Sequence, residues 1–289
     1  MMANLFTLNM TQIPLADWIN KFVNWLTQFV GFFNGITNFI GGIVNGFQAI
    51  FDILPIWLFI IIVLGITYWA LHDSKHWGLM LFELLGLLLI WNQGYWRDMT
   101  QTLTLVLTSS LIIVIIGIPL GIWMAKSNTV HLIVKPILDF MQTMPAFVYL
   151  IPAVSLFGIG MVPGVIASVI FSLPPVVRMT DLGIQQVPAD LVEAADSFGS
   201  TGWQKLVKVE LPIAKSTLMS GVNQGMMLAL SMVVIASMIG ATGLGAQVYF
   251  AVGRNNAGSG FAAGIAIVIL AIILDRITQA FNKNKKSSD

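Results

Sequence analysis

The sequence has no cysteine and very few charged residues. Only 9% of its 289 residues are Asp, Glu, Lys or Arg, whereas an ordinary soluble domain has about 25%. The absence of cysteine excludes a disulfide framework and thiolate metal ligands. Hydrophobic residues make up 57% of the chain, and the mean hydropathy is +0.86. This composition predicts a polytopic, all-α membrane protein.

Residues that carry catalytic or metal chemistry are also scarce. The three histidines, His72, His76 and His131, fall in expected loops without an H-E-x-x-H motif, which argues against a zinc site or an intramembrane hydrolase. No G-x-x-x-x-G-K-[ST] run is present, so the chain has no P-loop to hold ATP phosphates. The net charge of +1 gives no reason to propose nucleic acid as a partner. We expect no catalytic residue, metal or cofactor in this chain.

Residues 1–53 show neither a typical signal peptide nor a membrane-spanning run. Instead, aromatic and aliphatic residues from Trp18 to Ile50 recur at steps of three and four, with Asn and Gln opposite them. This pattern predicts an amphipathic helix at the membrane interface, and its five glycines suggest one or two bends. Packing of the same helix on the protein's own surface is an equal alternative.

Seven later stretches are long and apolar enough to approach the roughly 20 residues that a helix needs to cross a bilayer. Residues 54–98 hold two predicted accessory crossings, and residues 99–275 hold the other five. The predicted spans are Leu54 to Leu71, Trp77 to Gln93, Met99 to Ala125, Pro136 to Phe157, Met161 to Val177, Leu218 to Ile239 and Phe261 to Leu274.

The distribution of basic residues predicts the orientation. If the hydrophilic interval 178–217 is cytoplasmic, eleven of the 14 Lys and Arg residues lie inside and three outside, namely Lys21, Arg97 and Arg254. This obeys the positive-inside rule. We therefore expect the N-terminal helix outside, and the basic tail 276–289 in the cytoplasm. Glu83 falls in the middle of a predicted crossing, where we expect a structural hydrogen bond.

The interval 178–217 reads as two short helices that meet at a glycine. Asp190 is predicted to cap the first helix, with Glu193 completing a capping box, and Gly199 to end it in a left-handed conformation. Thr201 and Gln204 repeat the capping pattern, and Pro212 suits the first turn of the next helix. On spacing alone, a plain loop between membrane helices is as good an interpretation.

The identities of the residues in this interval indicate a function more specifically than their spacing does. Glu193-Ala194-Ala195, then Gly199 after three residues, then Val209 and Leu211-Pro212 resemble the EAA signature of binding-protein-dependent ABC importer permeases. Val209 stands where isoleucine is usual. The resemblance implies the type I importer permease fold, with this segment as the helix that docks on a separate ATPase. The residues that it assigns to coupling are Asp190, Glu193, Ala194, Ala195, Gly199, Leu211 and Pro212.

The runs from Gln142 to Pro188 and from Gly221 to Gly245 resemble one branch more closely, the permeases of glycine betaine and proline betaine importers. That resemblance covers roughly residues 99–274. It implies an external solute-binding protein and an ATPase dimer that carries ATP and Mg²⁺, both as separate chains, and a permease homodimer in the cell membrane. Expected pathway residues, polar, aromatic or sulfur-containing, are Met141, Gln142, Phe147, Tyr149, Asn223, Gln224 and Ser231.

Two other functions are weighed against this one. An ABC permease for another small solute, such as choline, carnitine or an amino acid, fits the same motif. An ion-coupled secondary carrier would need inverted repeats and midplane broken helices, and no internal repeat is visible. Such a carrier would also not need the two short helices of the interval 178–217.

Overall fold

The computed structural model describes residues 13–71 and 77–283, which form helices and turns without any strand. The predicted loop around His72 and His76 and the end of the basic tail lie outside these residues. In order, the helical elements are α1 Leu15–Leu26, α2 Val30–Ile53, α3 Ile56–Leu71, α4 Trp77–Asn92, α5 Trp96–Lys126, α6 Asn128–Thr143, η1 Ala146–Tyr149, α7 Leu150–Phe157, α8 Met161–Gln185, α9 Ala189–Ser197, α10 Gly202–Lys205, η2 Leu206–Glu210, α11 Leu211–Ser237, α12 Leu244–Gly253 and α13 Ala257–Lys283.

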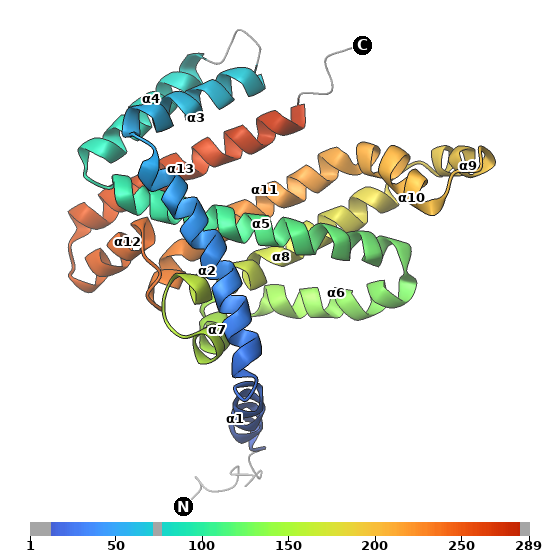
Figure 1. The fold of residues 1–289 in the computed structure, drawn as a ribbon, viewed down its shortest axis with the longest axis horizontal. Coiled ribbons are helices and arrows are strands. Elements are labelled where there is room, and N and C mark those ends of the chain that lie inside the picture. Colours follow the sequence, from blue (N-terminus) through green and yellow to red (C-terminus); the bar gives the residue numbers. More distant parts are fainter. Residues whose placement is uncertain (1–12, 72–76, 284–289) are drawn as a thin grey trace, which may run out of the picture.

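Helices α5, α8 and α11 form the centre of the molecule and run side by side (Figure 1). Small residues let their backbones approach closely, as in other membrane helix bundles. A Cβ atom added to Gly121 of α5 would lie 2.6 Å from the carbonyl oxygen of Val177 in α8. Gly121 is therefore required for the α5–α8 contact.

Four helices are long and apolar enough to cross a membrane, namely α5, α8, α10 to α11 taken together, and α13. Two bent pairs raise the number of candidate spans to six: α2 with α3, bent by 106°, and α6 with η1 and α7, bent by 109°. The sequence predicted seven crossings, which is more than the described residues support. Helices α3 and α4 have 16 residues each, about 24 Å at 1.5 Å per residue, against a hydrocarbon core of about 30 Å.

The predicted span Pro136 to Phe157 is not one straight helix. Pro145 disfavours a helical conformation at the preceding residue, and Met144 is extended with a ψ of 138°. Helix α6 therefore ends at Thr143, and the chain turns into η1 and α7. Helix α12, a short apolar helix, was not predicted because its ten residues are too few to cross a bilayer.

The N-terminal amphipathic region consists of two helices instead of one. They separate at Thr27–Phe29, and not at any of the five glycines, all of which lie inside α2. Helix α2 runs across the bundle at a steep angle to α5 and α8 (Figure 1) and buries Ile40 and Val44 against it. Phe32 and Phe39 on its other side remain 65% and 69% exposed. The helix thus both packs on the protein and presents an apolar side outward.

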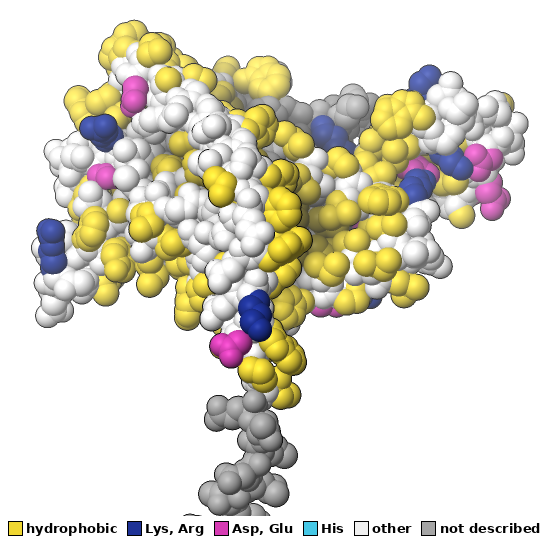
Figure 2. All heavy atoms as spheres, turned by 60° about the horizontal axis from the view of Figure 1, so that its bottom comes forward, with side chains coloured by type: hydrophobic (Ala, Val, Ile, Leu, Met, Phe, Trp, Pro, Cys, Tyr) yellow, Lys and Arg dark blue, Asp and Glu magenta, His cyan; other side chains and the backbone are white. Residues whose placement is uncertain are grey.

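Helices α3 and α4 lie beside each other near α13, at the edge of the bundle (Figure 1). Glu83 of α4 is fully buried, and the Thr67 hydroxyl of α3 donates a hydrogen bond of 2.9 Å to its carboxylate. The predicted structural hydrogen bond of Glu83 is confirmed. Charged side chains gather at the two ends of the bundle and on α1, with apolar surface between them, in the face that Figure 2 shows.

Candidate functional site: a capped helical knuckle and a polar pathway

Helices α9 and α10 project from one end of the bundle (Figure 1), and we call residues 188–210 the knuckle. Pro188, extended at φ −55° and ψ 132°, precedes the first helical residue, Ala189. The predictions that Asp190 caps this helix and that Glu193 completes a capping box were wrong, because Pro188 occupies the cap position and α9 has no side-chain cap. Asp190 lies in the first turn, where its charge complements the helix dipole.

The end of α9 agrees with the prediction for Gly199. Its φ is +73°, and nothing lies within 4 Å of the Cβ position. The Ser200 N–H donates to the carbonyl of Ala195 at 3.0 Å, and the Gly199 N–H donates to that of Asp196 at 2.9 Å. These two bonds make a Schellman motif, which satisfies carbonyls at the helix end. The turn between α9 and α10 is therefore fixed by hydrogen bonds.

The second helix begins with the predicted capping box. The Gln204 N–H donates to the Thr201 hydroxyl at 3.3 Å, and the Thr201 N–H donates to the Gln204 side chain at 2.9 Å. This helix is not a separate short element, however. It continues through the π turn η2 into α11, and the Leu211 N–H donates to the carbonyl of Leu206, five residues back.

The π turn explains how Pro212 lies in a continuous helix. Proline has no N–H and its ring crowds the carbonyl four residues back, which normally kinks a helix. A π turn widens the helix locally and removes this conflict. Leu211, next to it, is partly buried against Leu206 and the end of α5. Leu211 and Pro212, two of the predicted coupling residues, thus lie where the knuckle joins α11.

The outer surface of the knuckle is apolar in part. Phe198 is 90% exposed and Trp203 is 74% exposed. Leu191 of α9 is also exposed. Glu193 and Ala194 are also exposed, whereas Ala195 is buried. Leu191, Ala194, Ala195 and Phe198 recur at helical spacing on one side of the sequence of α9, and of these only Ala195 is buried. Exposed aromatic residues on a capped, projecting element are typical of a protein–protein contact.

The predicted pathway residues of α6 and η1 divide into two kinds. Tyr149 is 6% exposed and its hydroxyl donates to the carbonyl of Met141. Met141 itself packs against Leu138 and Val177. In contrast, Gln142 is exposed and accepts a hydrogen bond from Arg178, and Phe147 is 59% exposed. Of these four predicted residues, Gln142 and Phe147 are the two with exposed side chains.

The three predicted residues of α11 also differ. The side-chain amide of Asn223 donates to Asp275 of α13 at 2.8 Å. Gln224 and Ser231 are both exposed and, being seven residues apart, lie on one face of the helix. Tyr149 packs against Met232 of the same helix. The bend after α6 therefore packs on α11 at the residue that follows Ser231. We call the exposed polar candidates Gln142 of α6 and Gln224 and Ser231 of α11 the polar region.

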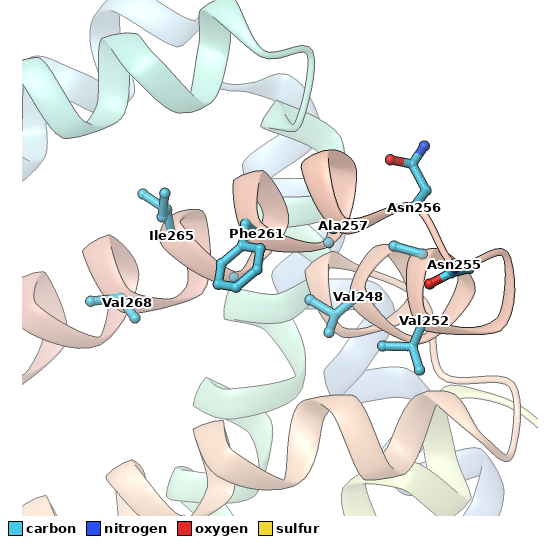
Figure 3. Close-up of a pocket in the computed structure, with 11 residues that line it drawn as sticks. Val248, Val252, Asn255, Asn256, Ala257, Phe261, Ile265 and Val268 are labelled. Atoms are coloured by element: carbon cyan, nitrogen blue, oxygen red, sulfur yellow. The ribbon is translucent and has the colours of Figure 1, made fainter.

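A hollow of about 610 Å³ lies between α12 and α13 (Figure 3). Its walls are apolar, with Val248, Val252, Phe261 and Ile265 among them, and only Asn255 and Asn256 at one end are polar. None of the predicted pathway residues lines this hollow. It contacts neither the knuckle nor the polar face of α11, so we assign it no part in the pathway.

Two features of the site were missed by sequence reasoning. The exposure of Phe198 and Trp203 was missed because helical spacing alone does not distinguish a core face from a docking face. The ion pair between Lys126 and Glu210 was missed because the two residues are 84 positions apart. The burial of Glu210, which requires a partner for its charge, is visible only in the folded structure.

Comparison with known proteins agrees with this geometry. Residues 117–287 match the family described as binding-protein-dependent transport system inner membrane component. The glycine betaine/carnitine transport permease protein GbuB of Listeria monocytogenes is 73% identical over 279 residues, which cover 96% of this chain and 99% of that protein. The glycine betaine transport system permease protein OpuAB of Bacillus subtilis is 55% identical over the same length, covering 96% and 98%.

Solved structures support the fold. An inward-facing structure of the MetNI methionine ABC transporter aligns with a TM-score of 0.57 at 21% identity, covering 72% of this chain and 99% of that one. An amino acid ABC transporter crystallised with histidines aligns with a TM-score of 0.53, covering 68% and 97%. The family match, the high identity to permease proteins and the capped EAA segment agree. The chain belongs to the family of inner-membrane components of binding-protein-dependent transport systems, the permease subunits of ABC importers.

Proposed function

We propose that this chain is the permease subunit of an ATP-driven importer of glycine betaine and related quaternary ammonium osmolytes. The knuckle carries the proposal: it is rigid, projects from the bundle and presents Phe198 and Trp203 outward. A separate ATPase dimer would bind this surface, hold the ATP and Mg²⁺, and move α9 as it closes. Helices α8 and α11, which flank the knuckle, would then switch the pathway between its two sides.

The substrate class rests on the relatives and on the chemistry of the polar region. GbuB is named as a glycine betaine/carnitine permease and OpuAB as a glycine betaine permease, and this chain is 73% and 55% identical to them. The exposed candidates Gln142, Gln224 and Ser231 are uncharged, and the two charged groups beside Gln142, Arg178 and Asp139, pair with each other. A betaine is a zwitterion without net charge, so its passage needs no fixed counter-charge. Tight binding would be supplied by a separate solute-binding protein outside, because a deep site in the permease would trap the solute.

The assembly follows from the single EAA segment. One knuckle per chain fits one ATPase subunit, so a permease homodimer on an ATPase dimer is the arrangement we propose. In this arrangement the knuckle and the tail lie in the cytoplasm, and α1 and α2 lie outside. The basic residues favour that orientation, as the positive-inside rule requires.

Reconstitution tests this function. The purified permease, its ATPase and its solute-binding protein are placed in liposomes, and ATP hydrolysis is measured with glycine betaine, carnitine, choline or histidine. We expect glycine betaine to stimulate hydrolysis most. Stimulation by histidine alone would support the importer function but contradict the osmolyte as its substrate. A permease that binds no ATPase would contradict the whole proposal.

A further inference from the structure

Glu210 is the last residue of the π turn and is 2% exposed. Both of its carboxylate oxygens lie 2.6 Å from Nζ of Lys126. Lys126 is the last residue of α5, a helix that is not adjacent to the knuckle in sequence. The pair therefore joins the base of the knuckle to a third helix, besides α8 and α11.

The chemistry of the pair makes it a strong link. A carboxylate loses much of its hydration when buried, and a partner charge at hydrogen-bond distance must replace it. The Lys126 side chain is 42% exposed, so its ammonium keeps some contact with solvent while it holds Glu210. Its charge also complements the carbonyl end of α5. Separating the two groups would leave Glu210 buried without compensation.

An apolar contact accompanies the ion pair. Leu206, the first residue of the π turn, is 9% exposed and belongs to a cluster with Ile184 and Ala214. Ile122 and Ala125 of α5 pack against the same cluster. The π turn is thus held to the end of α5 at both of its ends, by Leu206 and by Glu210.

The end of α5 leads directly into α6. Ser127 follows Lys126 and caps α6, its hydroxyl accepting from the Val130 N–H at 3.5 Å. At its other end α6 carries Gln142, one of the exposed pathway candidates, and Arg178 of α8 pairs with Asp139 of α6. A displacement of the α5–α6 corner would therefore reach the polar region.

We propose that the Lys126–Glu210 ion pair transmits movement of the knuckle to the α5–α6 corner, so that α6 moves with α8 and α11 when the ATPase closes. This inference rests on the proposed function. Lys126 and Glu210 are positioning residues in this account, since neither contacts the solute or ATP. Their loss should uncouple hydrolysis from transport without removing the ATPase from the complex.

The test is a charge exchange in proteoliposomes that contain the complete complex. Lys126→Glu and Glu210→Lys are made singly and together, and the number of betaine molecules imported per ATP hydrolysed is measured. We expect each single reversal to lower this ratio about fivefold or more, with hydrolysis retained, and the double exchange to restore it. Lys135→Glu is the control for a reversed lysine charge, because Lys135 is exposed on α6 and lies outside both the knuckle and the ion pair, and we expect it to leave the ratio unchanged.

Glu210→Gln covers the case in which the reversals do not fold, because it keeps the size of the side chain and removes only its charge. A lowered ratio in this variant supports the link. A wild-type ratio in Glu210→Gln or in the single reversals would overturn it, and so would loss of ATPase binding that the double exchange fails to restore. Wild type is measured alongside: if betaine does not stimulate its hydrolysis, the proposed function fails, whereas equal coupling in wild type and variants contradicts only the ion-pair link.

Discussion

The backbone at Gly199 has a φ of +73°, and no atom lies within 4 Å of the position that a Cβ atom would take. A side chain there would meet no neighbour, so the requirement for glycine comes from backbone conformation alone. L-residues other than glycine lose roughly 1–2 kcal/mol in this conformation. The residue thus fixes the angle between α9 and α10.

We expect Gly199→Ala to destabilise the turn by about 1 kcal/mol and to lower betaine-stimulated ATP hydrolysis, while the protein still inserts in the membrane. Gly202→Ala is the control, since Gly202 has ordinary helical geometry and an open Cβ position. Hydrolysis and thermal unfolding are compared for both variants. Equal behaviour of the two would show that the left-handed conformation does not matter for coupling.

Residue-level prediction from sequence succeeded where one local rule decides the conformation. Gly199 and the Thr201–Gln204 capping box are confirmed because each depends on residues within four positions. The prediction for Asp190 was wrong because Pro188, two positions earlier, occupies the cap position. The hydrogen bond of Asn223 could not be predicted without the fold, because its partner Asp275 belongs to another helix.

At the scale of elements, the knuckle is a rigid corner with one exposed apolar surface. Asp196 of α9 and Lys205 of α10 are 2.8 Å apart, which adds an ion pair across the corner. Phe198 and Trp203, one from each arm, are exposed on it. Docking of both arms on one partner would move them as a unit.

We expect Phe198→Ser to weaken ATPase binding by roughly tenfold to a hundredfold, since burial of a phenylalanine side chain contributes about 1.5–3 kcal/mol. Phe261→Ser is the control, because Phe261 is 76% exposed but lies on α13 beside the apolar hollow. Co-purification of ATPase with each variant measures the effect. Retention of full binding by Phe198→Ser would contradict the docking surface.

The apolar cores of the membrane elements were predictable, but the positions and angles of their bends were not. The cores of α5, α8, α11 and α13 were found because continuous apolar runs identify them. The prolines from Pro145 onward favour bent helices, but the angle of 109° after α6 was not predicted, because an apolar run reads the same whether straight or folded back. The joining of α10 to α11 was missed because a π turn leaves no mark in hydrophobic periodicity.

At the scale of the whole molecule, α5, α8 and α11 connect the knuckle at one end to the polar region around Gln224 and Ser231. A single chain leaves that polar face of α11 exposed. In the proposed homodimer, the corresponding faces of two chains would enclose a pathway between them. The accessory helices α3 and α4 lie at the edge of the bundle, next to α13 (Figure 1).

The most direct test of the account is a cross-link between the knuckle and the ATPase. The chain has no cysteine, so Ala194→Cys introduces a unique thiol on the exposed side of α9, and Phe261→Cys gives a control thiol far from the knuckle. We expect Ala194→Cys to cross-link to single cysteines around the ATPase cleft and the cross-link to abolish betaine-stimulated hydrolysis, with no such product from Phe261→Cys. Absence of any cross-link in an assembled, transport-active complex would contradict the claim that the knuckle couples the ATPase to this permease.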